Sequence, residues 1–247
     1  MNVNEFIALG IYSSIFLALF ALGEILFHVA KMPVEMTRKI VHIITGLICL
    51  TLPAYVGSHW TVLFLTVSFI LILVFSMKWN LLKSINSVNR KTIGSFLFPV
   101  SVYLTYWAFS ILGLNDFDAN GLLDYQTDNS AWYNGAILYY YLPILILAIS
   151  DPMATLVGRK LQMGKFKVMG TTKTLIGSLG FLVSTLIISY CFISVLDLSM
   201  GWIILVCTVI ALVTTVVEAL SQKGFDNILI PLSTLLVLYL FRNLLMI

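Results

Sequence analysis

The segment from residue 148 to residue 178 carries the strongest chemical signal in the chain: AISDPMATLVGRKLQMGKFKVMGTTKTLIGS. Asp151 follows the apolar run LPILILAI without an adjacent cation, and a carboxylate at membrane depth is costly unless it has a function or a partner. Pro152 removes a backbone donor directly beside it. Because Mg²⁺ is often held by one or two carboxylates and shared with substrate phosphates, we predict that Asp151 is a metal ligand and a catalytic residue.

Glycines alternate with lysine and arginine from Gly158 to the start of the next apolar run. Close backbone approach, a helix N-terminus and cationic side chains together suit a polyphosphate. The spacing is not that of a Walker loop. A positive-inside loop with solvated lysines would explain the basic residues but neither Asp151 nor the glycines. We therefore predict that nucleotide phosphates are bound by Gly158, Arg159, Lys165, Lys173, Thr174, Gly177 and Ser178, with Lys173 close to the reaction.

A second polar cluster lies in EMTRKIVHIITG, at the start of another apolar run. Glu35, Lys39, His42 and Gly46 are spaced as one stripe of a helix. We expect Arg38, Lys39 and His42 to serve the transferred phosphate or the acceptor hydroxyl. The alternative is a positive-inside anchor with a histidine that hydrogen-bonds to a neighbouring helix.

Two further polar segments adjoin apolar runs. In VEALSQKGFDNILIP, Asp226 and Asn227 either complete a metal shell with Asp151 or serve the N-terminus of the following helix, Asp226 as its N-cap. In NRKTIGSFLFP, Arg90 is a candidate phosphate ligand.

The composition excludes most soluble classes of protein. Of the 247 residues, 60% are hydrophobic and 10% charged, and the mean hydropathy is +1.01. Soluble domains carry about a quarter charged residues. A soluble enzyme, a nucleic-acid binder and a disordered chain are therefore excluded. The three cysteines (Cys49, Cys191 and Cys207) lie in apolar runs without metal-ligand spacing and are read as small core residues.

The apolar runs predict an all-α, polytopic transmembrane helical bundle that forms one integral membrane domain over residues 1–247. A bilayer core of about 30 Å needs roughly 20 residues of helix. About eight runs meet this length, or seven if a short or terminal one is left out. The expected spans are Phe6–Val29, Ile40–Val56, Trp60–Trp79, Gly94–Leu114, Ala136–Val157, Thr174–Leu196, Trp202–Leu220 and Ile228–Leu245.

The distribution of charge predicts the orientation. Thirteen of the 14 lysine and arginine residues fall in alternate loops, while the opposite loops carry aspartates. By the positive-inside rule, all four polar clusters face the cytoplasm, and both termini and the Asp116–Asp128 loop face the other side. We expect a multi-pass protein of the bacterial cytoplasmic (inner) membrane with its active site on the cytoplasmic side.

Four segments together resemble the polyprenol kinase family of integral membrane proteins, which includes dolichol kinases, phytol kinases and the CTP-dependent diacylglycerol kinase. The matching runs appear in the expected order: RKIVH (38–42), RKTIGSFLFP (90–99), SDPMATLVGR (150–159) with KTLIGS (173–178), and Glu218 with GFDNILIP (224–231). The 150–178 segment is also reminiscent of CDP-diacylglycerol synthases, whose long acidic signature near the C-terminus has no counterpart here.

The resemblance implies a lipid-alcohol kinase that uses a nucleoside triphosphate, commonly CTP, with Mg²⁺ as the expected cofactor. The acceptor would be a membrane lipid such as diacylglycerol, phytol or a polyprenol. A CDP-diacylglycerol synthase-like cytidylyltransferase is the alternative, and a membrane transporter is third because charge crowds one face rather than the midplane. No nucleic-acid partner is expected, and a homo-oligomeric state is left open.

Overall fold

The computed structural model describes residues 3–79, 93–112, 138–168 and 171–245. In these ranges seven helices are long and apolar enough to cross a membrane, which confirms the predicted all-α membrane bundle. The last predicted span is shorter: its main helix has 15 residues and is apolar, but it falls below the length that the other seven reach. Arg90 and the Asp116–Asp128 loop lie outside the described residues.

The helices follow the predicted spans to within a few residues at most ends. They are α1 (Val3–His28), α2 (Val34–Cys49), α3 (Leu52–Tyr55), α4 (His59–Trp79), α6 (Gly94–Leu112), α7 (Leu138–Leu145), α8 (Asp151–Leu161), α9 (Leu175–Ile193), α10 (Met200–Leu220), α11 (Asp226–Leu240) and α12 (Arg242–Leu245). A π-helix, η3 (Ile146–Ser150), joins α7 to α8, so that the three form one continuous helical segment long and apolar enough to cross a membrane.

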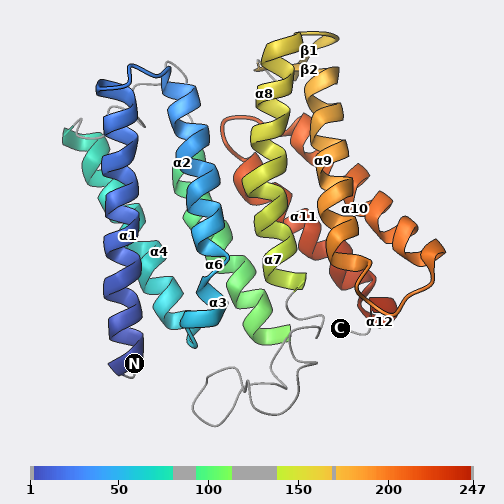
Figure 1. Cartoon of the computed structure of the whole chain (residues 1–247), viewed down its shortest axis with the longest axis horizontal. Coiled ribbons are helices and arrows are strands. Elements are labelled where there is room, and N and C mark those ends of the chain that lie inside the picture. The colour runs from blue at the N-terminus through green and yellow to red at the C-terminus, as the bar shows by residue number, and fades with distance from the viewer. Residues whose placement is uncertain (1–2, 80–92, 113–137, 169–170, 246–247) are drawn as a thin grey trace.

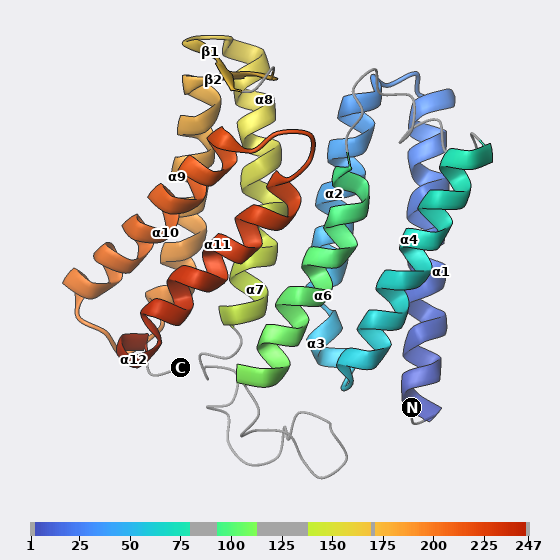
Figure 2. The same cartoon turned by 180° about the vertical axis from the view of Figure 1, so that it is seen from behind.

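The bundle has two parts that meet along its middle (Figures 1 and 2). One part contains α1, α2, α4 and α6, and the other contains α8, α9, α10 and α11. Helix α11 packs against α6, and η3 packs against α2, so that both contacts join the two parts. The charged cluster described below lies at this junction.

A short antiparallel hairpin lies at one end of the bundle, where the sequence predicted only a loop. Strands β1 (Lys165–Val168) and β2 (Thr171–Thr174) pair with Lys165 opposite Thr174. The start of α1 and helix α12 lie at the opposite end (Figure 1). The start of the first described helix and the last described helix are therefore on the same side of the bundle, which agrees with the predicted alternation of loops.

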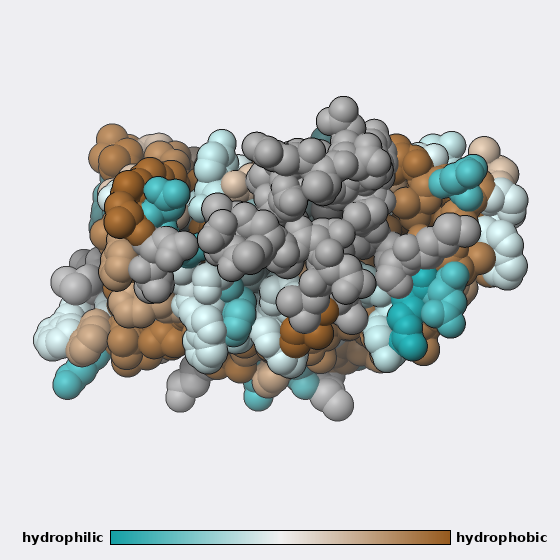
Figure 3. Space-filling model, turned by 90° about the horizontal axis from the view of Figure 1, so that it is seen from below, coloured by the Kyte–Doolittle hydropathy of each residue, from teal (hydrophilic) through white to brown (hydrophobic). Residues whose placement is uncertain are grey.

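The outer surface is apolar over most of the bundle. Large hydrophobic side chains such as Phe64 and Ile187 are more than half exposed. Figure 3 views the end opposite the hairpin and shows hydrophobic residues around much of its rim. An exposed apolar belt of this extent is what a bilayer covers.

Candidate active site

One cavity of about 800 Å³ brings the predicted polar clusters together. Its charged end is formed by Lys39, His42, Asp151, Lys173, Glu218 and Asp226. Its apolar arm continues between α1, α2, α4 and α6 and is lined by Phe16, Leu19, Phe20, Leu65, Phe69 and Val102. Cys49 at the end of α2, Leu52 of α3 and Val62 in the first turn of α4 also line it. Both chemical environments thus belong to one continuous space.

The centre of the charged end is an ion pair between α2 and α8. Lys39 Nζ donates a hydrogen bond of 2.6 Å to Asp151 Oδ2, and both side chains are largely buried. A lone buried carboxylate would be strongly unfavourable, so Lys39 supplies the countercharge that the sequence around Asp151 lacks. The pair also fixes the end of α2 relative to α8.

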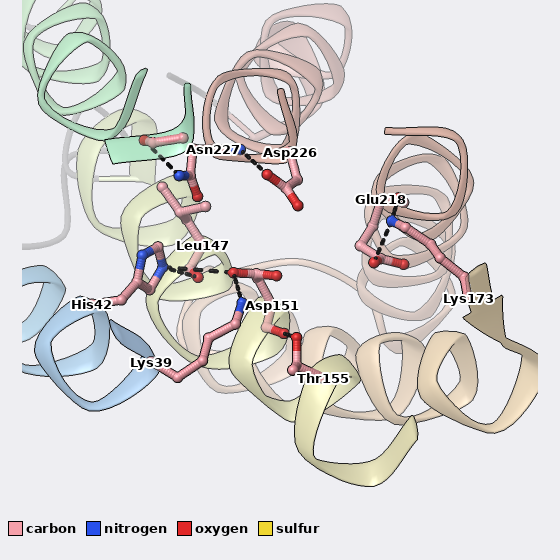
Figure 4. A network of polar contacts seen from close by, with 10 residues as sticks. Lys39, His42, Leu147, Asp151, Thr155, Lys173, Glu218, Asp226 and Asn227 are labelled. Carbon is pink, nitrogen blue, oxygen red and sulfur yellow. Dashed lines mark hydrogen bonds and ion pairs between the residues drawn. The ribbon is translucent and has the colours of Figure 1, made fainter. Parts of the chain in front are cut away.

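The π-helix before Asp151 explains how His42 is oriented (Figure 4). In a π-helix the Leu147 carbonyl would accept from residue 152, but that residue is a proline without an N–H. The carbonyl instead lies 3.1 Å from His42 Nε2, and because a carbonyl can only accept, His42 is the donor. His42 Nε2 also lies 3.8 Å from Asp151 Oδ2. The π-helix therefore brings His42 and Asp151 together in the same part of the cavity.

Lys173 reaches the same space from β2. Its Nζ lies 2.7 Å from Glu218 Oε1 and also donates to the Glu218 main-chain carbonyl. Glu218 belongs to the last turn of α10 and is buried. In the sequence, Glu218 belongs to a run that matches the polyprenol kinase family, but no role was assigned to it. The structure makes it the side chain that holds Lys173 at the cavity wall.

Asp226 and Asn227 open α11 on the far side of the cavity (Figure 4). Asp226 is the first helical residue rather than the N-cap, and its Oδ1 accepts from the Asn227 backbone N–H at 3.0 Å. Asn227 Nδ2 donates to the Gly94 carbonyl at 2.7 Å, which connects α11 to the start of α6. Asn227 thus has a structural contact, while the Asp226 carboxylate faces the cavity.

Three carboxylates share the charged end with two lysines. Asp226 interacts electrostatically with Asp151, Lys39 and Lys173, and Glu218 interacts with both aspartates. Within the described ranges no three His, Cys, Asp or Glu residues gather closely enough to hold a metal by themselves. Mg²⁺ does not need such a group, because it usually keeps several waters and takes one or two protein carboxylates together with phosphate oxygens. Asp151 and Asp226 fit this kind of donor set.

The glycines of the predicted phosphate segment have packing roles. A Cβ on Gly177 would lie 2.7 Å from the Ala154 carbonyl and 3.3 Å from Gly158 Cα, so both glycines permit the close contact of α8 with α9. Thr174 caps α9, since its Oγ1 accepts from the Gly177 N–H at 3.1 Å. All three residues still line the cavity.

The remaining phosphate candidates are placed differently. Arg159 lines the cavity and forms a half-exposed ion pair with Glu35, across the opening between α8 and α2. Arg38 also lines the cavity. Lys165 does not: it is exposed on β1 and donates to Gln162 Oε1 at 2.8 Å. The structure therefore brings together every predicted site residue that it describes except Lys165.

Two buried hydroxyl groups at the cavity wall have no hydrogen-bond partner among the described residues. They belong to Thr37 on α2 and Ser178 on α9. Buried polar atoms are nearly always satisfied, so each unpaired one needs an explanation. A polar ligand in the cavity would supply the missing partners. Ser178 was predicted from its glycine-rich context, whereas nothing in the sequence around Thr37 singled it out.

The chain is similar to the phytol kinase of Synechocystis sp., with 27% identity over 245 residues, which cover 96% of this chain and 92% of the relative. The resemblance to the polyprenol kinase family is confirmed. The similarity spans all the polar clusters that line the cavity. No protein-family model matches the chain, and no solved structure matches it significantly.

Proposed function

We propose that the protein is a lipid-alcohol kinase that transfers the γ-phosphoryl group of a nucleoside triphosphate to the hydroxyl of a membrane lipid. The observation that carries the proposal is the single cavity whose charged end continues into an apolar arm. A lipid alcohol has the same two parts, a polar hydroxyl and a hydrocarbon chain. The similarity to a phytol kinase over nearly the whole chain supports the same reaction class.

The basic residues of the charged end have roles that follow from their positions. Lys173, held by Glu218, and Arg159, at the mouth between α2 and α8, would bind the phosphates of the nucleotide. Lys39 lies at the centre and would neutralise the transferred group. Phosphoryl transfer depends mainly on such positioning and charge neutralisation, because the transition state spreads negative charge over the phosphoryl oxygens.

A Mg²⁺ ion would be held by Asp151 and Asp226. When bound, it would supply charge neutralisation at the phosphate oxygens. Arg38 and Arg159 also line the cavity, so the cation would be shared between the two aspartates and the phosphate oxygens rather than held by an excess of carboxylates.

The reaction forms a bond between the lipid oxygen and the γ-phosphorus and breaks the bond from that phosphorus to the β-phosphate oxygen. The hydroxyl proton passes to a carboxylate of the charged end, and the nucleoside diphosphate leaves. His42 lies on the apolar side of the charged end, where the centroid of its ring is 4.8 Å from that of the Phe98 ring. It would orient the acceptor hydroxyl toward the charged end.

We further propose CTP as the preferred donor and the cytoplasmic face as the side of the reaction. The donor rests on the family resemblance, and no residue is assigned to base recognition. The side rests on the partition of basic residues.

Purified protein in liposomes, supplied with a lipid extract and with CTP or ATP in parallel, tests the proposal. A product whose mass exceeds that of an alcohol in the extract by one phosphate is expected, with more product from CTP. Equal or better turnover with ATP would remove the donor assignment alone. A product heavier by a nucleoside monophosphate would instead support the cytidylyltransferase alternative.

A further inference from the structure

We propose that the apolar arm is a closed pocket for one hydrocarbon chain of the acceptor and that its floor at Cys49, Leu52 and Val62 limits the length of that chain. This inference rests on the proposed function, because it assigns the arm to the acceptor of that reaction. It goes further by naming the residues that select among single-chain alcohols.

The arm begins where the charged end stops. The rings of His42 and Phe98 meet at the boundary, and beyond them the walls are mainly apolar, with Thr66 donating its hydroxyl hydrogen to the Pro99 carbonyl. Phe69 packs edge-on against Phe16 at 4.8 Å and against Phe20 at 5.9 Å, so the wall between α1 and α4 is aromatic. A hydrocarbon chain attached to a hydroxyl at the boundary would extend into this space and lose its contact with water.

The floor is held by a set of hydrogen bonds behind it. The Tyr140 hydroxyl donates to the Cys49 carbonyl at 2.7 Å, and the Tyr12 hydroxyl lies 2.7 Å from Thr51 Oγ1. The Tyr106 hydroxyl donates to the Val56 carbonyl. All three tyrosines are buried. The connection from α2 to α4 is therefore anchored from several helices.

A buried carboxylate completes this anchoring. Glu5 of α1 accepts from the Gly57 N–H at 2.9 Å and from the Thr61 hydroxyl, beside the start of α4. Leu52 and Val62 are only 2% and 1% exposed. A floor fixed in this way cannot yield easily to a longer chain, because closely packed interiors resist changes of even one methylene.

The stretch of helix between the boundary and the floor sets the length of chain that the arm can hold. His42 and Leu52 are ten residues apart along α2 and its continuation into α3, which corresponds to about 15 Å of helix. A chain longer than the arm would have to bend or leave it sideways.

The experiment measures turnover of geraniol, farnesol and geranylgeraniol, which differ only in chain length, by the purified protein in liposomes. Val62→Phe fills the floor and should lower the ratio of geranylgeraniol to geraniol turnover about tenfold, since a small change in an apolar pocket discriminates by that order. Val62→Ala should raise the same ratio. Val67→Phe is the matched control, because Val67 lies on the same helix, is 47% exposed and does not line the cavity.

A second readout is independent of turnover. An isoprenoid alcohol with a diazirine at the chain end, irradiated without nucleotide, should label peptides that contain Cys49, Leu52 or Val62. If wild-type protein phosphorylates the alcohols, but Val62 variants keep its chain-length ratio and label falls only on outward-facing residues, the inference is wrong. Labelling at the floor, without phosphorylation of these alcohols or of any alcohol in the lipid extract, would support the chain pocket and reject the proposed function.

Discussion

Lys39 and Asp151 are 112 residues apart in the sequence, yet Lys39 Nζ lies 2.6 Å from Asp151 Oδ2. Gly46 permits this contact, because any side chain at this position would collide with Ala148 of η3 and push α2 away from η3. The pair has two explanations: it can organise a reaction centre, or it can merely neutralise two buried charges. These explanations make different predictions.

Asp151→Asn should abolish turnover, because the amide has the same shape but carries no charge to hold a metal or to balance Lys39. The variant should also lose thermal stability, since it leaves Lys39 buried and unpaired. The double variant Lys39→Gln with Asp151→Asn removes that unpaired charge and should recover stability while staying inactive. Turnover and melting temperature are measured on the same preparations. Recovery of activity in the double variant would reduce the pair to a structural role.

Lys173→Ala should weaken use of the nucleotide by about 2–3 kcal/mol in kcat/KM, a factor of roughly 30 to 150, as expected for a charge-assisted contact to phosphate. Lys165→Ala is the matched control, since it removes the same type of charge from the same hairpin but outside the cavity. Its kcat/KM should stay close to that of the wild type. Similar losses in both variants would indicate a general effect of surface charge.

Thr37→Val should raise the KM for nucleotide or lipid about threefold to tenfold and leave the melting temperature unchanged or higher. The reason is that its buried hydroxyl has no partner among the described residues, so the folded protein loses no hydrogen bond, while a bound ligand would. Ser178→Ala should behave in the same way. A fall in stability without any change in KM would contradict a ligand-binding role for these hydroxyls.

The proposed orientation predicts that Lys165 and Asp197 lie on opposite sides of the membrane. Lys165 lies on β1 opposite Thr174, which caps the start of α9, and Asp197 follows the end of α9; both are exposed. In a background without Cys49, Cys191 and Cys207, a Lys165→Cys variant should be labelled only from the cytoplasmic side and an Asp197→Cys variant only from the other side. The reverse pattern would invert the topology and move the charged end away from the cytoplasm.

The fold could be predicted from the sequence because most of the apolar runs are about as long as a bilayer core requires and polar segments separate them. The stripe of Glu35, Lys39 and His42 also followed from helical spacing, and all three line the cavity. Local periodicity shows which residues share a face. It does not show which helix packs against that face.

The features that depend on packing between distant segments could not be predicted. The countercharge of Asp151 comes from α2, and Glu218 holds Lys173 from a helix that follows it in the chain. The π-helix before Asp151 has no signature beyond Pro152, and the hairpin that carries Lys165 was expected as an irregular loop. The apolar arm is formed by side chains from four helices, so it could not be predicted from any one segment of the sequence.

The most direct test of the central claim uses the same protein, lipid and CTP with the radioactive label in two positions. With the label on the γ-phosphate, the lipid product should become radioactive; with the label on the α-phosphate, it should not. The Asp151→Asn variant should give no labelled lipid in either case. Label in the lipid from the α-position would contradict the kinase and identify a nucleotidyl transfer instead.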